Sequence, residues 1–203
     1  NGSDVFEGVV YRQLSSIPAQ PIKWLWPGKF AKGKLSIIAG NPGLGKSQIC
    51  ASIASIVSTG GQWPVDRTRT DPANVVILSA EDDAEDTIRP RLEAAGADLD
   101  RIYLLQAIRG EDGNSGEIYT RGFSLVSDTD RLASLIGKIG NVDLVVIDPI
   151  TAYMGATDSH RNAEVRSLLA PLQALAQTLN PAVIAVSHLT KAQGVEALQR
   201  IQG

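Results

Sequence analysis

Short runs of consecutive apolar residues alternate along the chain with longer stretches in which apolar residues recur every three or four positions. Continuous apolar runs are typical of strands that are buried on both faces of a sheet. They predict strands at 35–39, 75–79, 102–105, 144–148 and 182–186. Because strand alternates with helix, the pattern predicts the α/β class, with a mostly parallel sheet flanked by helices on both faces.

The stretches between the predicted strands have the 3.6-residue spacing of helices. They predict helices at 46–58, 84–95, 127–139 and 162–179. Pro171 lies within the last of these helices and is expected to kink it, because proline has no N–H group to donate.

Two parts of the chain depart from this alternation. Residues 1–21 are interpreted as a lead-in segment, in which Pro18 and Pro21 favour an extended backbone. A single domain is expected to follow at 22–203. Residues 109–122 are rich in glycine and in charged side chains, and they predict a mobile excursion or a hairpin.

The balance of charges is slightly acidic, with 22 acidic and 19 basic residues and a net charge of −3. No bulk positive field therefore draws the chain to nucleic acid or to an anionic membrane. Any contact with DNA must come from local loops or from a ring of subunits. Trp24 and Trp26 could stack on a base, but closely spaced tryptophans more often cover the edge of a core.

The single cysteine, Cys50, excludes an internal disulfide, and together with two histidines it is too little for a zinc site. We expect Cys50 to be a small core residue. We find no run of about 18 apolar residues, as a membrane span requires, and recognise no signal peptide. These features predict a cytoplasmic protein without membrane contact.

The most informative motif follows the first predicted strand and precedes the first predicted helix. It has the form G-x-x-x-x-G-K-S and comprises Gly40, Asn41, Pro42, Gly43, Leu44, Gly45, Lys46 and Ser47. In this context it is a P-loop, whose glycines let backbone N–H groups and the helix N-terminus surround phosphate oxygens. Lys46 would reach the β- and γ-phosphates, Ser47 would bind Mg²⁺, and Gln48 follows at the same helix start. A glycine turn with a chance lysine is the alternative. The motif predicts a nucleoside triphosphate as ligand.

Ligands of open α/β sheets bind at the carboxyl ends of the strands. Asp148 ends the fourth predicted strand directly after four apolar residues, which is the pattern of a Walker B motif, and it would hold Mg²⁺ through the water shell of the ion. Glu81 follows the second strand and would orient the attacking water. His188 follows the fifth strand and would act as a sensor of the γ-phosphate, to which it could donate a hydrogen bond. Pro149 comes directly after Asp148, which disfavours an enzyme that places its catalytic carboxylate there.

Each of these residues also has a purely structural interpretation. Asp148 could start a turn before a proline, and His188 could be satisfied by backbone groups. Glu81 could belong to an acidic cap of the next helix, although Asp82 and Asp83 fit that role better.

Together the strand-end residues resemble those of the RecA/DnaB-like ATPases. The local sequences at 80–82, 91–97, 147–149 and 187–191 are similar to those of the plasmid hexameric replicative helicases of the RepA type. They are more similar still to the RepA-like AAA-domain ATPases of phages and mobile elements, which are often fused to a primase–polymerase module. The resemblance covers about 22–195 and implies a RecA-like P-loop fold.

The resemblance also implies ligands and roles. ATP and Mg²⁺ would be bound by the P-loop and by Asp148, with Lys46, Glu81 and His188 as catalytic residues and Glu81 as the base. Arg91 would stack on adenine. The residues that it implies for DNA contact are His160, Arg161 and Lys191.

The function implied is the motor domain of a homo-hexameric DNA helicase that moves along single-stranded DNA in plasmid, phage or mobile-element replication, with a primase or polymerase as partner or fused module. An ATP-gated regulatory or scaffold ATPase of the same fold is the alternative. A small-molecule kinase is less favoured, because no arginine-rich lid is present. Relatives continue with strands that carry an arginine for the neighbouring subunit's site. We therefore expect either a C-terminally truncated domain or a trans-acting arginine elsewhere.

Overall fold

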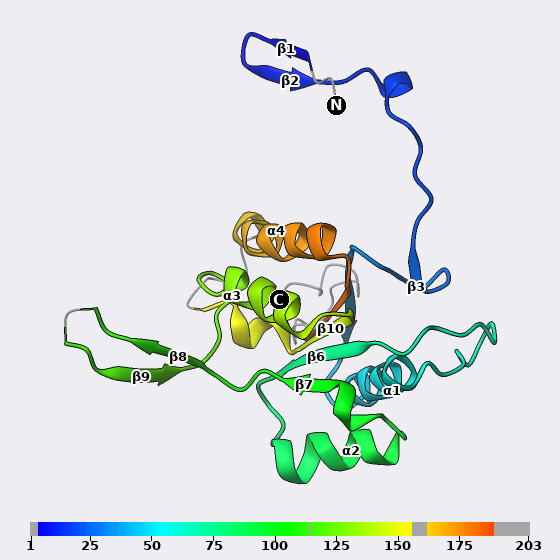
Figure 1. The fold of residues 1–203 in the computed structure, drawn as a ribbon, viewed down its shortest axis with the longest axis vertical. Coiled ribbons are helices and arrows are strands. Elements are labelled where there is room, and N and C mark those ends of the chain that lie inside the picture. The colour runs from blue at the N-terminus through cyan, green and yellow to red at the C-terminus, as the bar shows by residue number, and fades with distance from the viewer. Residues whose placement is uncertain (1–3, 114, 156–161, 189–203) are drawn as a thin grey trace, which may run out of the picture.

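A five-stranded sheet forms the centre of the molecule, as Figure 1 shows. The computed structural model describes residues 4–113, 115–155 and 162–188, apart from the side chains of Asp4 and of 162–168. All neighbouring strands are parallel. Their order is β5 (Leu35–Gly40), β11 (Ala182–His188), β10 (Val142–Asp148), β6 (Asn74–Ser79) and β7 (Ile102–Leu104). The predicted α/β class and its parallel sheet are confirmed.

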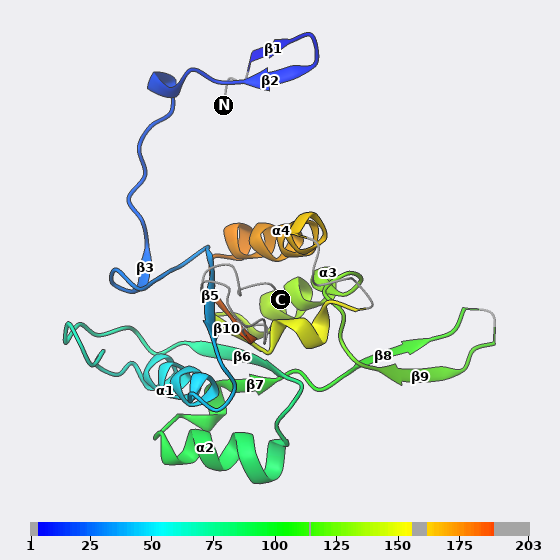
Figure 2. The same cartoon turned by 180° about the vertical axis from the view of Figure 1, so that it is seen from behind.

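Helices cover both faces of this sheet (Figures 1 and 2). The helices are α1 (Lys46–Thr59) and α2 (Arg89–Ala94) on one face, and α3 (Thr129–Ile139) and α4 (Asn162–Leu179) on the other. Alternate side chains of each central strand enter opposite cores: Leu144 and Val146 belong to the core with α1, and Val145 and Ile147 to the core with α3 and α4. This double burial explains the continuous apolar runs of the inner strands β6, β10 and β11, whereas the edge strands β5 and β7 are partly exposed.

The helix predicted at 84–95 differs from the observed one. Residues Ala84–Ile88 form a π-helical turn, η2, and the α-helix begins only at Arg89. The backbone N–H of Ile88 donates to the carbonyl of Asp83, five residues earlier, over 2.9 Å. Pro90 lies in the first turn of α2 and has no N–H, which accounts for the shift in hydrogen-bond pattern at this junction.

Two antiparallel hairpins are attached to the domain. Residues 109–122 contain the predicted hairpin, formed by β8 (Ile108–Glu111) and β9 (Ile118–Arg121), which projects away from the sheet (Figure 1). The other hairpin consists of β3 (Trp24–Trp26) and β4 (Phe30–Ala31). Short 3₁₀ segments are η1 (Leu14–Ser16), η3 (Leu99–Arg101) and η4 (Ile150–Tyr153).

The two early tryptophans have different environments. Trp26 stacks on Trp63 at a centroid distance of 4.7 Å, and Trp63 is fully buried. Trp24 is 41% exposed. The prediction of a core edge is therefore confirmed for Trp26 and wrong for Trp24. Cys50 is buried as expected, and burial raises the pKa of its thiol to about 12, so that it is an unreactive core residue.

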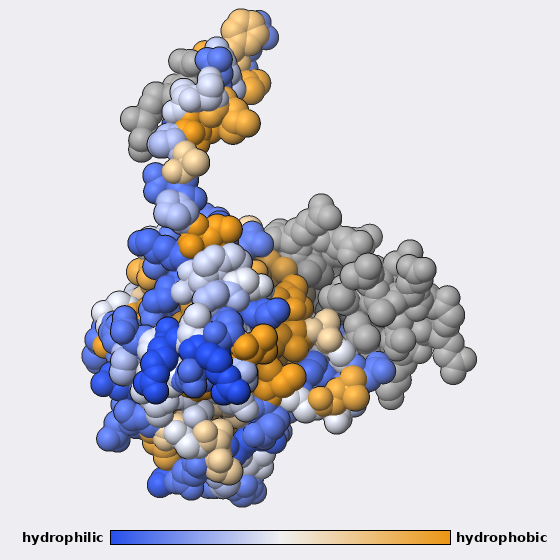
Figure 3. Space-filling view, turned by 90° about the vertical axis from the view of Figure 1, so that its right-hand side faces the viewer, coloured by the Kyte–Doolittle hydropathy of each residue, from blue (hydrophilic) through white to orange (hydrophobic). Residues whose placement is uncertain are grey.

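The N-terminal strands β1 (Asp4–Phe6) and β2 (Val9–Tyr11) pair with each other and stand apart from the domain (Figures 1 and 2). Apolar side chains gather on this hairpin (Figure 3). Those that are more than half exposed are Val5, Phe6, Val9, Val10 and Tyr11. No helix in the described part of the chain combines the length and apolar character needed to cross a membrane.

An ion pair between the partly exposed Arg121 and a buried carboxylate fastens the β8–β9 hairpin to the start of α3. Arg121 donates to both carboxylate oxygens of Asp128 over 2.6 and 2.7 Å, and the Ser124 N–H donates to the same carboxylate over 2.9 Å. Asp128 is fully buried. The hydrogen bonds from Arg121 are the main reason that the pKa of Asp128 falls to about 2.

Replacement of Asp128 by asparagine is expected to lower the free energy of unfolding by about 2 kcal/mol at pH 7. A carboxylate with a lowered pKa stabilises the folded state above its unfolded pKa near 4, and this stabilisation is lost as the pH falls toward the folded pKa. The difference between the two proteins should therefore shrink to about half at pH 3. Urea denaturation at both pH values measures it, with the exposed Asp130→Asn as control; a pH-independent difference contradicts the assignment.

Candidate functional site

The P-loop connects β5 to α1 and is shaped by two glycines. Gly43 and Gly45 both have φ of +78°, a left-handed conformation that favours glycine. No atom lies within 4 Å of the position that a Cβ would take at either residue. The space beside both glycines is therefore open, as is required in a loop that surrounds phosphate oxygens.

Lys46 begins α1 and folds its side chain back over this loop. It is only 7% exposed. Its ammonium group donates to the carbonyls of Gly40 and Asn41, both over 2.9 Å. Leu44, in contrast, is 68% exposed. The loop thus holds a buried cation, while its one large apolar side chain faces solvent.

The strand register aligns the remaining candidate residues. His188 at the end of β11 lies opposite Gly40 at the end of β5, and Asp148 at the end of β10 lies opposite Ser79 at the end of β6. Glu81 follows two residues after β6. Parallel strands that end in register bring side chains far apart in sequence to one edge of the sheet.

Asp148 lies half-buried beside Ser47. Burial is the main reason that the pKa of Asp148 is raised, and a hydrogen bond with Ser47 opposes this effect. The negative charges of Asp82 and Glu81 raise the pKa of Asp148 further, while His188 lowers it. A hydroxyl and a carboxylate in contact, within a field of further carboxylates, form a suitable place for a hard divalent cation.

Glu81 and His188 face each other across the site. The Glu81 side chain is 61% exposed, and its Oε2 lies 3.6 Å from Nε2 of His188. The other ring nitrogen of His188, Nδ1, is buried and has no hydrogen-bond partner within the part of the chain that the structure describes. Glu81 is therefore open to water on one side and near an imidazole on the other.

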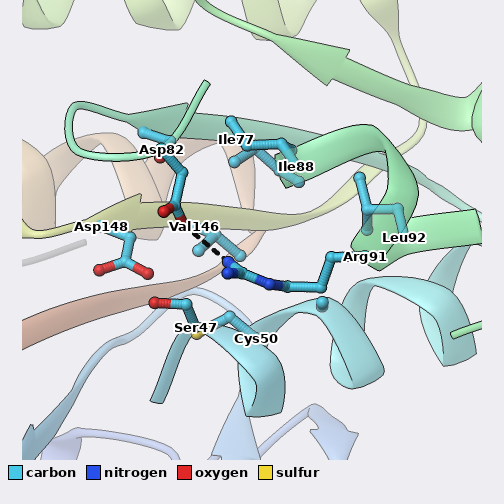
Figure 4. A pocket seen from close by; sticks show the side chains of 11 residues that line it. Ser47, Cys50, Ile77, Asp82, Ile88, Arg91, Leu92, Val146 and Asp148 are labelled. Atoms are coloured by element: carbon cyan, nitrogen blue, oxygen red, sulfur yellow. Dashed lines mark hydrogen bonds and ion pairs between the residues drawn. The ribbon is translucent and has the colours of Figure 1, made fainter. Parts of the chain in front are cut away.

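Asp82 does not cap the following helix, in contrast to the prediction. Asp83 alone does so, since its Oδ1 accepts from the Glu85 N–H over 2.9 Å. The Asp82 carboxylate turns the other way and accepts from Nη1 of Arg91 over 2.6 Å (Figure 4). Asp82 is thus a site residue that sequence reasoning missed, because its partner lies nine positions away across the π-helical turn.

These groups surround one cleft of about 410 Å³. The predicted site residues with side chains on its wall are Lys46, Ser47, Gln48, Glu81, Arg91, Asp148 and His188. Pro42, Gly43 and Gly45 line it from the loop, and Ser79 is a further lining residue that was not predicted. The predicted DNA contacts His160, Arg161 and Lys191 lie outside the described residues.

The chemistry of the cleft fits a magnesium nucleotide. The open loop and Lys46 suit phosphate oxygens, and Ser47 with Asp148 supplies the oxygen ligands that Mg²⁺ prefers. A family described as AAA domain matches residues 5–194. The chain belongs to this family. Its AAA domain is of the RecA-like P-loop ATPase type.

Curated relatives of this AAA domain carry the name DNA repair protein RadA. The protein from Streptococcus pneumoniae (strain ATCC BAA-255 / R6) is 26% identical over 164 residues, which are 81% of this chain and 32% of that protein. The one from Streptococcus pyogenes serotype M6 (strain ATCC BAA-946 / MGAS10394) is 29% identical over 164 residues, 81% of this chain and 30% of that protein. The chain spans about a third of the length of these relatives.

Proposed function

We propose that this AAA domain binds ATP with Mg²⁺, hydrolyses it, and is the motor of a hexameric DNA helicase in plasmid, phage or mobile-element replication. The observation that carries this proposal is the meeting of Lys46, Glu81, Asp148 and His188 at one cleft, each at the end of a different strand or at the P-loop. Phosphoryl transfer to water needs bound phosphates, a cation, a positioned water and charge compensation. The cleft offers a group for each of these requirements.

In this proposal the P-loop N–H groups and Lys46 bind the phosphates. The Lys46 ammonium exchanges its loop carbonyls for phosphate oxygens, which accept stronger, charge-assisted hydrogen bonds. Ser47 and Asp148 would hold Mg²⁺, which would supply positive charge that neutralises the phosphates. Arg91 lies on the wall of the same cleft, and its planar guanidinium would stack on the adenine.

Glu81 is the proposed general base. Its exposed carboxylate can orient a water and take its proton, and its position near His188 links it to the end of β11. His188 would respond to the γ-phosphate and pass its presence to the residues that follow β11.

DNA and a ring of subunits are the proposed partners. The relatives are named for DNA repair, which supports DNA as the nucleic acid that this domain binds. The exposed apolar hairpin β1–β2 supports assembly, because an isolated two-stranded hairpin is marginally stable in water and gains from a covering surface. His160, Arg161 and Lys191 are the proposed DNA contacts, and a primase or polymerase is the proposed partner or fused module.

The test is ATP turnover with and without single-stranded DNA, at two salt concentrations, together with the particle mass from light scattering. We expect a hexameric mass and turnover that DNA stimulates at least about fivefold, with the stimulation falling as salt rises. Turnover indifferent to DNA would instead support an ATP-gated regulatory ATPase. Transfer of phosphate to an acceptor other than water would support a kinase and contradict the motor.

A further inference from the structure

Asp82 and Arg91 form an ion pair at the border between two hollows of the domain. Together with Ser47 and Asp148 they line both the 410 Å³ cleft and a second, smaller chamber, and Figure 4 shows the lining of this chamber. This chamber has a volume of about 30 Å³, room for about one water. Its walls are otherwise mainly apolar, with Ile88 among them.

Arg91 is held at both ends of its side chain. The aliphatic stem extends from α2 along the apolar chamber, while the guanidinium reaches the Asp82 carboxylate (Figure 4). The two side chains are 27% and 29% exposed, so that solvent and salt screen their attraction less than that of a surface pair. A free arginine side chain loses considerable rotamer entropy when it is fixed. The ion pair removes much of this freedom before a ligand arrives.

We propose that Asp82 is a positioning residue, which holds the guanidinium plane of Arg91 at the wall of the cleft so that it receives the base of the nucleotide. This inference rests on the proposed function, in which Arg91 stacks on adenine. Hydrogen bonding through the edge of a guanidinium leaves its faces free, and those faces stack on aromatic rings. Asp82 thus sets the affinity for the nucleoside part of ATP without touching it.

Because Asp82 is negatively charged, a pure charge effect and a positioning role predict opposite changes in ATP affinity when Asp82 is replaced by asparagine. Removing a negative charge close to the triphosphate should by itself strengthen the binding of any polyanion. A loss of ATP affinity in Asp82→Asn that tripolyphosphate does not share therefore cannot be a charge effect, and it is assigned to the freed Arg91. A role of Asp82 in holding the cation would weaken every magnesium polyphosphate, whether or not it carries a base.

The experiment measures the dissociation constants of magnesium ATP and of magnesium tripolyphosphate by calorimetry, for the full chain and for Asp82→Asn. We expect ATP to bind about tenfold more weakly to the variant, the loss typical of one charge-assisted hydrogen bond. Tripolyphosphate should bind as tightly as before or more tightly. In turnover, KM for ATP should rise by a similar factor while kcat stays unchanged, because Asp82 touches no reacting atom.

Matched variants separate positioning from a general disturbance. Arg91→Lys keeps the charge but lacks the planar face, and should lose ATP affinity to the same extent as Asp82→Asn. The double variant should be no weaker than Arg91→Lys, since both changes remove one effect. Asp82→Glu retains a carboxylate and should restore most of the affinity. Asp86→Asn removes an exposed charge from the same turn, outside the cleft lining, and should change nothing.

Three outcomes overturn the inference. Equal losses for ATP and tripolyphosphate assign Asp82 to the cation, and unchanged ATP affinity reduces the ion pair to a structural contact. Normal ATP affinity in Arg91→Lys would show that Arg91 does not stack on the base. This result overturns the inference even if Asp82→Asn fails to fold. If the unaltered chain binds neither magnesium ATP nor tripolyphosphate, the proposed function fails instead, before Asp82 is tested.

Discussion

Lys46→Ala is expected to weaken the binding of magnesium ATP by a hundredfold or more, as the loss of about two charge-assisted hydrogen bonds to phosphate implies. The Lys46 ammonium lies over the P-loop, 7% exposed, and its present partners are two backbone carbonyls. No other lysine lines the cleft within the described part of the chain. Calorimetric titration of both proteins with magnesium ATP measures the change.

Lys34→Ala is the matched control for this substitution. Lys34 is exposed and lies just before β5, whereas the P-loop follows the end of the same strand. Its removal lowers the net charge by the same amount but leaves the cleft intact, so ATP affinity should stay within about twofold of the original. Similar losses in the two variants would mean that general charge, rather than the position of Lys46, determines affinity.

Much of the fold could be predicted because its signals are local. A strand covered on both faces must be apolar at every position, so the buried strands of the central sheet are visible as continuous runs. The P-loop is local too, since the left-handed backbone at Gly43 and Gly45 demands glycine at fixed positions. The rule that ligands bind at the carboxyl ends of parallel strands then indicated where Asp148 and His188 would lie.

The remainder depended on contacts between distant residues. Trp26 is partly buried because it stacks on the buried Trp63, and no pattern near Trp24 distinguishes the two early tryptophans. Asp82 was assigned to a helix cap because acidic residues before a helix usually serve there. Its actual partner, Arg91, is brought close by the π-helical turn, a geometry that periodicity of apolar residues does not reveal.

Glu81→Gln is expected to reduce ATP turnover by between about a hundredfold and ten thousandfold, the contribution typical of a general base. Glutamine has almost the same shape and can still orient a water, but its amide cannot take the proton. Affinity for magnesium ATP should be retained or slightly increased, because one negative charge is lost near the phosphates. Phosphate release and calorimetric binding measured on the same preparation test both parts.

Glu85→Gln gives the matched control, since Glu85 is an exposed glutamate in the next turn of the chain and does not line the nucleotide cleft. Its turnover should be unchanged. Retained turnover in Glu81→Gln would contradict the assignment of Glu81 as the general base. Another group would then have to accept the proton, and Asp82 is the neighbouring carboxylate on the cleft wall. That group is already hydrogen-bonded to Arg91, whereas Glu81 is 61% exposed and lies 3.6 Å from His188. Because the Asp82 carboxylate is engaged by the guanidinium while Glu81 is open to water, the structure favours Glu81 as the base.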